Sequence, residues 1–177
     1  MKINSIELNN FRNLSSVHLS AESGVNVIYG ENAQGKTNIL ESIFLFTGLK
    51  SFRSSKDSEL VSFGKDFSRL EIGFKTSLRE QYAEIKITDR RRAALNGVSL
   101  PSTTALMSKF PAALFSPGFM SLIQNGPSER RKFIDSAICQ ITPKYAALIT
   151  EYSRPLKQRN AILKDTENIK DIKDIKT

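Results

Sequence analysis

Eight residues from Gly30 to Thr37 follow the pattern Gly-x-x-x-x-Gly-Lys-Thr, which suits the binding of a nucleoside triphosphate. Gly30 and Gly35 allow turns that residues with a Cβ avoid, so backbone N–H groups can face phosphate oxygens. The Lys36 ammonium can reach the β- and γ-phosphates, and the Thr37 hydroxyl can coordinate Mg²⁺. The candidate phosphate-binding residues are therefore Gly30, Glu31, Asn32, Ala33, Gln34, Gly35, Lys36 and Thr37.

The residues on both sides of this loop match what its chemistry requires. Val25–Tyr29 is short, β-branched and placed between glycines, which predicts a strand that leads into the loop. After the loop, apolar residues recur at helical spacing up to Gly48, a candidate helix end. Strand, loop and helix in this order favour a phosphate site over a chance glycine turn.

Composition predicts one globular domain with a hydrophobic core and room for a smaller appendage, since 40% of the 177 residues are apolar. No apolar run approaches the ~20 residues of a membrane span, and Met1–Ser5 does not resemble a signal peptide. We therefore expect a cytoplasmic protein without a membrane partner. Cys139 lies on an apolar helical pattern and should be a buried thiol, and His18 should have a surface or structural role.

The positive charge is concentrated in the second half of the chain. From Asp89 onward, 15 Lys and Arg residues stand against 8 Asp and Glu residues, which accounts for +7 of the net +8. This surplus favours a polyanion such as a nucleic acid, although a solvated basic face would give the same composition. Arg90, Arg91 and Arg92 have two interpretations: a charged strand edge that discourages aggregation, or a contact to DNA phosphate.

Alternating apolar and polar residues predict a mainly β first part of the chain. A half-exposed hairpin is expected from two such runs, and Asn96-Gly97 is a strong hairpin-turn signal. The expected strands beside Val25–Tyr29 are Ile3–Leu8, Val17–Leu19, Leu70–Lys75, Tyr82–Ile87 and Ala112–Phe115.

Helices are expected after this β section. Pro127 can begin one helix, and Thr142-Pro143 supplies an N-cap and first-turn proline for another, which Pro155 should kink or interrupt. The terminal run from Ile169 to Thr177 repeats every three residues without an aromatic anchor, and we expect weak order there.

The sequence shows no complete hydrolytic site. A phosphate-loop ATPase also needs an acidic residue at a strand end to hold Mg²⁺, and a group that orients water. Asp89 and Asp135 are the nearest matches to the acidic residue that would hold Mg²⁺. No Leu-Ser-Gly-Gly-Gln-like signature occurs in the sequence. The chain is therefore either a fragment or a nucleotide-binding protein without the full machinery, and no residue is assigned as catalytic.

Several segments together resemble the RecF family of bacterial recombination mediators, which is grouped with the structural-maintenance-of-chromosomes (SMC) and ABC-type ATPases. The resemblance covers nearly the whole chain. It rests on Asn10–Asn13, Gly24–Val27, Gly30–Asn38, Leu40–Ile43, Ser51–Arg53, Asn96-Gly97, Phe115–Pro117, Gly126–Asp135 and Gln158–Asn160.

This resemblance implies an α/β phosphate-loop ATPase head of the ABC type, with a mixed sheet and an antiparallel β part. We expect residues 1–118 to form the N-terminal part of the ATPase head, with the phosphate-binding loop and the antiparallel β section. Residues 119–177 should form part of a helical second lobe, inside which the chain stops. The resemblance places Arg12 and Asn13 near the nucleotide, and Arg53 near phosphate or DNA. The sequence departs from the family pattern at Gly118-Phe119-Met120, because family members usually have acidic residues after Ser-Pro.

For a whole protein of this family, the resemblance implies ATP and Mg²⁺ as cofactors, weak ATP hydrolysis and an ATP-dependent homodimer on single-stranded or gapped DNA. It also implies cooperation with the RecO and RecR proteins in DNA repair, replication, DNA damage and the SOS response. The present chain should bind ATP weakly without turnover. Two alternatives are a small phosphate-loop kinase and a nucleotide-independent DNA-binding module. The kinase is disfavoured because the midsection is predicted to be β hairpins, where a kinase would have helices and a lid.

Overall fold

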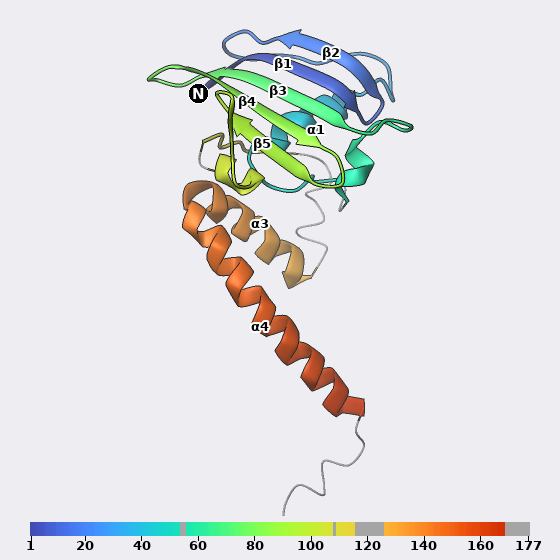
Figure 1. The fold of residues 1–177 in the computed structure, drawn as a ribbon, viewed down its shortest axis with the longest axis vertical. Helices are drawn as coiled ribbons and strands as arrows, with labels where there is room; N and C mark the ends of the chain where they lie inside the picture. The colour runs from blue at the N-terminus through green and yellow to red at the C-terminus, as the bar shows by residue number, and fades with distance from the viewer. Residues whose placement is uncertain (54–55, 108, 116–125, 169–177) are drawn as a thin grey trace, which may run out of the picture.

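The fold is built on one six-stranded antiparallel sheet in the order β2-β1-β3-β4-β5-β6 (Figure 1). The computed structural model describes all residues except 54–55, 108, 116–125 and 169–177. The strands are β1 (Lys2–Phe11), β2 (Leu14–Ser20), β3 (Ser68–Lys75), β4 (Glu80–Ile87), β5 (Arg91–Leu95) and β6 (Val98–Ser99). The helices are α1 (Lys36–Leu45), α3 (Pro127–Ile141) and α4 (Pro143–Asn168), with 3-10 turns η1 (Asp57–Leu60) and η2 (Thr103–Leu106).

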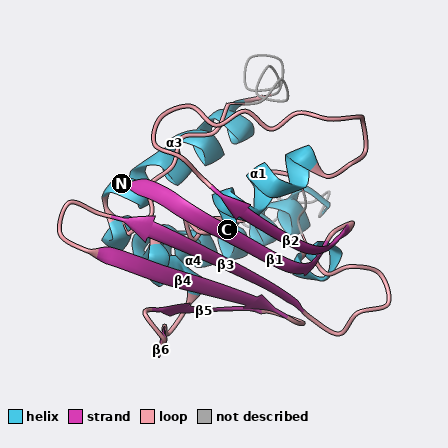
Figure 2. Ribbon diagram, turned by 90° about the horizontal axis from the view of Figure 1, so that it is seen from above, coloured by secondary structure: helices cyan, strands magenta, loops and turns pink. Residues whose placement is uncertain are grey.

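One face of the sheet forms the hydrophobic core, because side chains alternate between the two faces of a strand. Helix α1 and the residues that follow it pack on this face, and Figures 1 and 2 show α3 and α4 on the same side. Phe110 joins this core through ring contacts with Phe46 and Phe74. The fully buried strand residues include Leu8, Leu70, Ile72, Ile85 and Ile87.

The opposite face carries a row of carboxylates across three neighbouring strands. Glu7 pairs in register with Glu71, and Glu71 pairs with Glu84. Arg69 lies 2.8 Å from a carboxylate oxygen of both Glu71 and Glu84. Burial raises the pKa of Glu71 above its ordinary value, and Arg69 opposes that shift. The exposed His18 ring lies 3.1 Å from Glu7, which agrees with a surface role.

Two hairpins predicted from sequence are confirmed. Strands β3 and β4 pair over their whole length and connect through the turn at Thr76–Arg79. Asn96 and Gly97, with φ angles of 51° and 78°, form the turn between β5 and β6. Positive φ at both positions matches the twist of a two-residue hairpin, which explains why this dipeptide is so informative.

Two predicted strands are wrong. Val25–Tyr29 is not a strand in the structure, and Val25 and Tyr29 are 91% and 90% exposed. Ala112–Phe115 is also not a strand, and the Ala112 N–H donates to the Gln140 side chain on α3. Both segments have β-forming residues, but a strand requires a neighbour for its backbone groups. Within the described residues, neither segment pairs with a strand.

Helices begin at both predicted prolines, Pro127 and Pro143. Of the two outcomes expected at Pro155, an interruption of the second helix is wrong, because α4 continues through this residue, and a kink stays a prediction. Cys139 is buried on α3, as expected. No helix among the described residues is long and apolar enough to cross a membrane. The predicted domain boundary at residue 118, Gly118-Phe119-Met120 and the segment Ile169–Thr177 lie outside the described residues.

Candidate nucleotide-binding site

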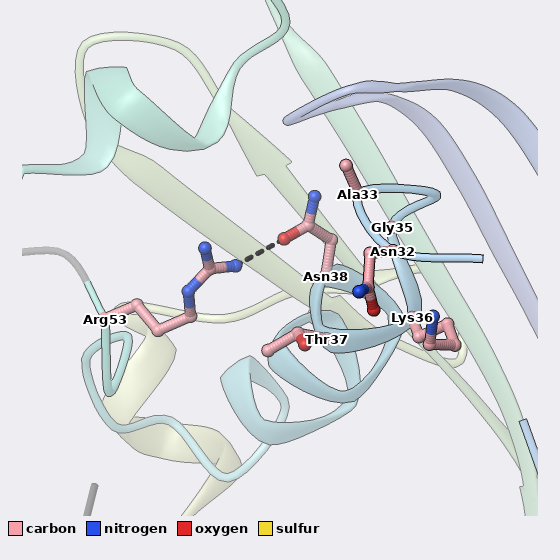
Figure 3. Close-up of a pocket in the computed structure, with 7 residues that line it drawn as sticks. All are labelled: Asn32, Ala33, Gly35, Lys36, Thr37, Asn38 and Arg53. Carbon is pink, nitrogen blue, oxygen red and sulfur yellow. Dashed lines mark hydrogen bonds between the residues drawn. The ribbon is translucent and has the colours of Figure 1, made fainter. Parts of the chain in front are cut away.

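The predicted phosphate loop lines a pocket of about 350 Å³ immediately before α1 (Figure 3). Arg53 reaches the same pocket from the segment that follows α1. The lining residues are Asn32, Ala33, Gly35, Lys36, Thr37, Asn38 and Arg53. The structure thus brings one predicted DNA or phosphate residue, Arg53, to the predicted phosphate loop.

The loop adopts the backbone conformation that its glycines predict. Gly30 and Gly35 have φ angles of 146° and 96°, and Ala33 is left-handed with φ of 65°. A Cβ on Gly35 would lie 2.5 Å from the Leu14 side chain, so the β1–β2 turn presses directly on the loop. Helix α1 starts at the next residue, and its first N–H groups and positive dipole end face the loop.

Lys36 folds back across its own loop. Its Nζ donates to the Gly30 carbonyl at 2.7 Å and to the Glu31 carbonyl at 2.6 Å. The Lys36 ammonium is therefore hydrogen-bonded to its own loop. To bind a phosphate, it has to break these two bonds and donate to phosphate oxygens instead. Thr37 lies beside it in the pocket, at the position from which a hydroxyl can reach a cation held by the phosphates.

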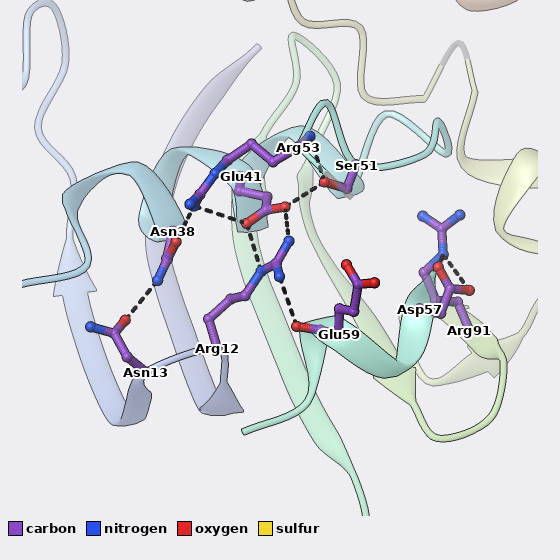
Figure 4. A network of polar contacts seen from close by, with 9 residues as sticks. All are labelled: Arg12, Asn13, Asn38, Glu41, Ser51, Arg53, Asp57, Glu59 and Arg91. Carbon is purple, nitrogen blue, oxygen red and sulfur yellow. Dashed lines mark hydrogen bonds and ion pairs between the residues drawn. The ribbon is translucent and has the colours of Figure 1, made fainter. Parts of the chain in front are cut away.

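Asn13 supports the loop from the turn between β1 and β2. Its Nδ2 donates to the Ala33 carbonyl at 2.9 Å. Its Oδ1 accepts from Asn38 Nδ2 at 2.6 Å (Figure 4). These two bonds hold the left-handed Ala33 and connect the turn to the first turn of α1. The predicted residue Asn13 therefore contacts the loop backbone, and it does not line the pocket itself.

Arg12 pairs with a buried carboxylate and is not among the residues that line the pocket. Its Nε and Nη2 donate to the two oxygens of Glu41 at 3.1 and 2.7 Å, and its Nη1 donates to the Glu59 carbonyl at 2.8 Å. The resemblance to RecF placed Arg12 near the nucleotide. In this structure its guanidinium joins the β1–β2 turn to α1 and η1, and its contact with a nucleotide stays a prediction.

Arg53 is the exposed arginine of the same network. Its Nη1 donates to Asn38 Oδ1 at 2.5 Å and lies 3.6 Å from Glu41. The side chain is 45% exposed and points toward the pocket.

Asn38, Glu41 and Ser51 were not predicted as site residues. Helical spacing could have indicated the first two, since Glu41 lies one turn after Thr37 and interrupts an apolar pattern. Asn38 directly follows the motif. No sequence signal indicates that Ser51 hydrogen-bonds Glu41.

The three consecutive arginines do not form one surface patch. Arg91 is inward, with its side chain 8% exposed, and donates to Asp57 Oδ2 at 3.1 Å and the Leu49 carbonyl at 2.7 Å. Arg90 and Arg92 are exposed. Alternation along β5 therefore gives Arg91 a structural partner and leaves only its neighbours available to a phosphate backbone.

The two acidic candidates for a cation site lie elsewhere. Asp89 lies in the β4–β5 turn, where the Thr88 hydroxyl bond lowers the pKa of its carboxyl, and Asp135 accepts from the Tyr145 hydroxyl on α4. Neither lines the pocket. Among the described residues, no group of three or more metal-ligating side chains occurs.

Comparison with known proteins agrees with this geometry. A family model described as an AAA domain matches residues 5–177. The chain belongs to the AAA domain family. It is 40% identical over 168 residues to the DNA replication and repair protein RecF of Clostridioides difficile strain 630, covering 93% of this chain and 45% of that protein. The chain thus spans about half the length of the RecF relatives that it matches.

Solved structures of similar proteins have the same fold. A structure described as the recombination mediator protein RecF-ATP in the RecFOR pathway matches with a TM-score of 0.84 and 37% identity, covering 93% of this chain and 45% of that one. An ATPase from a study of ATP-driven dimerization and DNA-stimulated activation of SMC ATPases shares the fold, with a TM-score of 0.61 and 21% identity. This match covers 77% of this chain and 99% of that one. The RecF resemblance and the predicted α/β ATPase-head fold are confirmed.

Proposed function

We propose that this chain is the ATP-binding part of a RecF-like DNA repair protein. The observation that carries the proposal is the pocket formed by the loop, Lys36, Thr37 and Arg53 before the N-terminus of α1. Its RecF relatives support ATP as the nucleotide, since one was solved as RecF-ATP. The fold places backbone donors, the Lys36 ammonium and a helix dipole around one pocket that can hold an anion.

The residues of the phosphate loop have distinct roles in this proposal. Backbone N–H groups from Asn32 to Lys36 hold the phosphates, and Lys36 leaves the Gly30 and Glu31 carbonyls to reach the β- and γ-phosphates. Thr37 coordinates Mg²⁺ together with phosphate oxygens and water. Asn13 keeps Ala33 in place from outside the pocket.

DNA is the proposed partner of the whole protein. The basic second half favours a phosphate backbone, and Arg53, Arg90 and Arg92 are the exposed members of the predicted contact set. By family resemblance the whole protein acts in the cytoplasm on single-stranded or gapped DNA. It works as an ATP-dependent homodimer with RecO and RecR, in repair linked to the SOS response.

The present chain should bind ATP without turning it over. Neither Asp89 nor Asp135 approaches the pocket, so the described residues supply Thr37 as the protein ligand for Mg²⁺. Isothermal titration with MgATP tests binding: Lys36→Ala should abolish it, and the exposed control Lys164→Ala on α4 should not change it. Equal binding by the wild type and Lys36→Ala would refute the proposal.

A further inference from the structure

A buried carboxylate, Glu41, lies at the centre of the polar network beside the pocket (Figure 4). Its side chain is 0% exposed and lies on the face of α1 that also carries Asn38. Burying a carboxylate costs free energy unless charged or hydrogen-bonding partners surround it. Glu41 has three such partners: Arg12, Ser51 and Arg53.

The two arginines are bound to Glu41 unequally. Arg12 makes a two-point contact with both carboxylate oxygens, and its own backbone N–H donates to the Leu60 carbonyl at 2.9 Å. Arg53 approaches Glu41 only to 3.6 Å and hydrogen-bonds Asn38 instead. Since the two-point geometry is the stronger one, Arg12 takes most of the carboxylate's attraction. Arg53 is therefore held near the pocket by a longer ion pair than the one that Arg12 makes.

Ser51 fixes the backbone at Arg53 relative to Glu41. Its hydroxyl donates to Glu41 Oε1 and accepts the Arg53 backbone N–H at 2.9 Å. The Glu41 carboxylate thus fixes the backbone of Arg53 through Ser51. Together with Asn38, it also holds the Arg53 guanidinium. The long arginine side chain loses conformational freedom before any ligand arrives, which lowers the entropic cost of binding one.

The position of Arg53 suits the last phosphate of a nucleotide. Backbone N–H groups of a phosphate loop surround the first two phosphates, whereas the third depends more on side chains and the cation. Figure 3 shows Arg53 approaching the pocket from the side opposite Lys36. A guanidinium on that side adds a second positive group to the pocket, and a triphosphate has one more phosphate than a diphosphate to meet it.

We propose that Glu41 is a positioning residue for Arg53, and that it thereby makes the site prefer a triphosphate over a diphosphate. This inference rests on the proposed ATP-binding function. In this proposal Glu41 binds Arg12 tightly, so that Arg12 supports the fold, and it holds Arg53 where its guanidinium can contact the nucleotide. Glu41 itself does not contact the ligand.

The test measures ATP and ADP affinities, each with Mg²⁺, for Arg53→Ala, Glu41→Gln and the double variant. Each single variant should weaken ATP binding ~10-fold, the size of one charge-assisted contact, and ADP binding less than ~2-fold. The double variant should lose little more than either single one, because both changes remove the same interaction. Glu71→Gln, a buried carboxylate on the other face of the sheet that also pairs with an arginine, should keep the ATP-to-ADP ratio unchanged.

Ser51→Ala tests the same positioning of Arg53 if Glu41→Gln does not fold. It leaves the Arg12–Glu41 pair in place and should reduce ATP affinity ~3-fold with a smaller effect on ADP. Equal losses of ATP and ADP in the positioning variants, or no loss in Arg53→Ala, would overturn the inference. Failure of the wild-type chain to bind either nucleotide would instead contradict the proposed function.

Discussion

Asn13 and Asn38, from the β1–β2 turn and the first turn of α1, are joined by a 2.6 Å hydrogen bond. Asn13 continues the connection to the Ala33 carbonyl, so a side chain outside the pocket fixes the left-handed residue inside the loop. The phosphate loop therefore depends on the N-terminal hairpin for its shape.

Replacing Asn13 by alanine should weaken ATP and ADP binding together, since the loop backbone contacts both. Two hydrogen bonds are lost, and we expect ~1–2 kcal/mol lower stability and about 5-fold weaker binding of each nucleotide. Urea unfolding and nucleotide titration measure the two effects. The exposed Asn160→Ala on α4 serves as control, and an ATP-selective loss in Asn13→Ala would contradict this role.

Gly35→Ala should be more damaging than Gly97→Ala, although both glycines have positive φ angles, of 96° and 78°. The backbone term is similar, ~1–2 kcal/mol for each. Only at Gly35 does the added Cβ meet a side chain, Leu14 Cδ2 at 2.5 Å, whereas Gly97 has open space. Thermal unfolding should show a larger loss for Gly35→Ala, accompanied by loss of ATP binding. Equal losses would show that the contact with Leu14 is easily relieved.

Arg91→Ala and Arg92→Ala should separate stability from DNA binding. Removing Arg91 leaves Asp57 and the Leu49 carbonyl without this donor, and should cost ~1–3 kcal/mol. Arg92→Ala should change stability by less than ~0.5 kcal/mol but weaken DNA binding and its salt dependence. Urea unfolding and DNA titration at several salt concentrations distinguish the two variants. Unchanged DNA binding by the double variant Arg90→Ala/Arg92→Ala would exclude this edge as a contact.

Cys139 should react slowly with alkylating agents in the folded protein. Burial, and then the nearby Asp135, raise the pKa of its thiol, while the thiolate is the reactive form. Native alkylation at pH 8 should be about 10-fold slower than in urea, and should accelerate only above the ordinary thiol range near ~8.5. The stabilising effect of the neutral thiol is present below the unfolded pKa and is lost as pH rises through the raised folded pKa. Equal rates with and without urea would show that Cys139 is accessible.

The parts of the fold that sequence predicted well depend on local signals. The loop from Gly30 to Thr37, the Asn96-Gly97 turn and the helices at Pro127 and Pro143 each rest on a few adjacent residues with strong conformational preferences. The resemblance to RecF supplied the position of Arg53 near phosphate, which the pocket agrees with.

The parts that sequence missed depend on distant partners. Val25–Tyr29 has strand-forming residues but no strand beside it among the described residues. Arg12 could be placed on Glu41 only once the register of β1 and the start of α1 were known, since the two residues lie far apart in sequence. The inward direction of Arg91 likewise depends on which face of β5 is buried.

The exposed segment Val25–Tyr29 should affect how this chain behaves in solution. Val25, Val27 and Tyr29 present strand-forming side chains to water on the approach to the phosphate loop. Such a segment, with strand-forming residues and backbone groups outside any sheet, can pair with its equivalent in other copies and so start aggregation. Concentrated solutions of the isolated chain should therefore lose protein by self-association beginning beside the nucleotide pocket, and a change of Val27 to lysine should slow that loss.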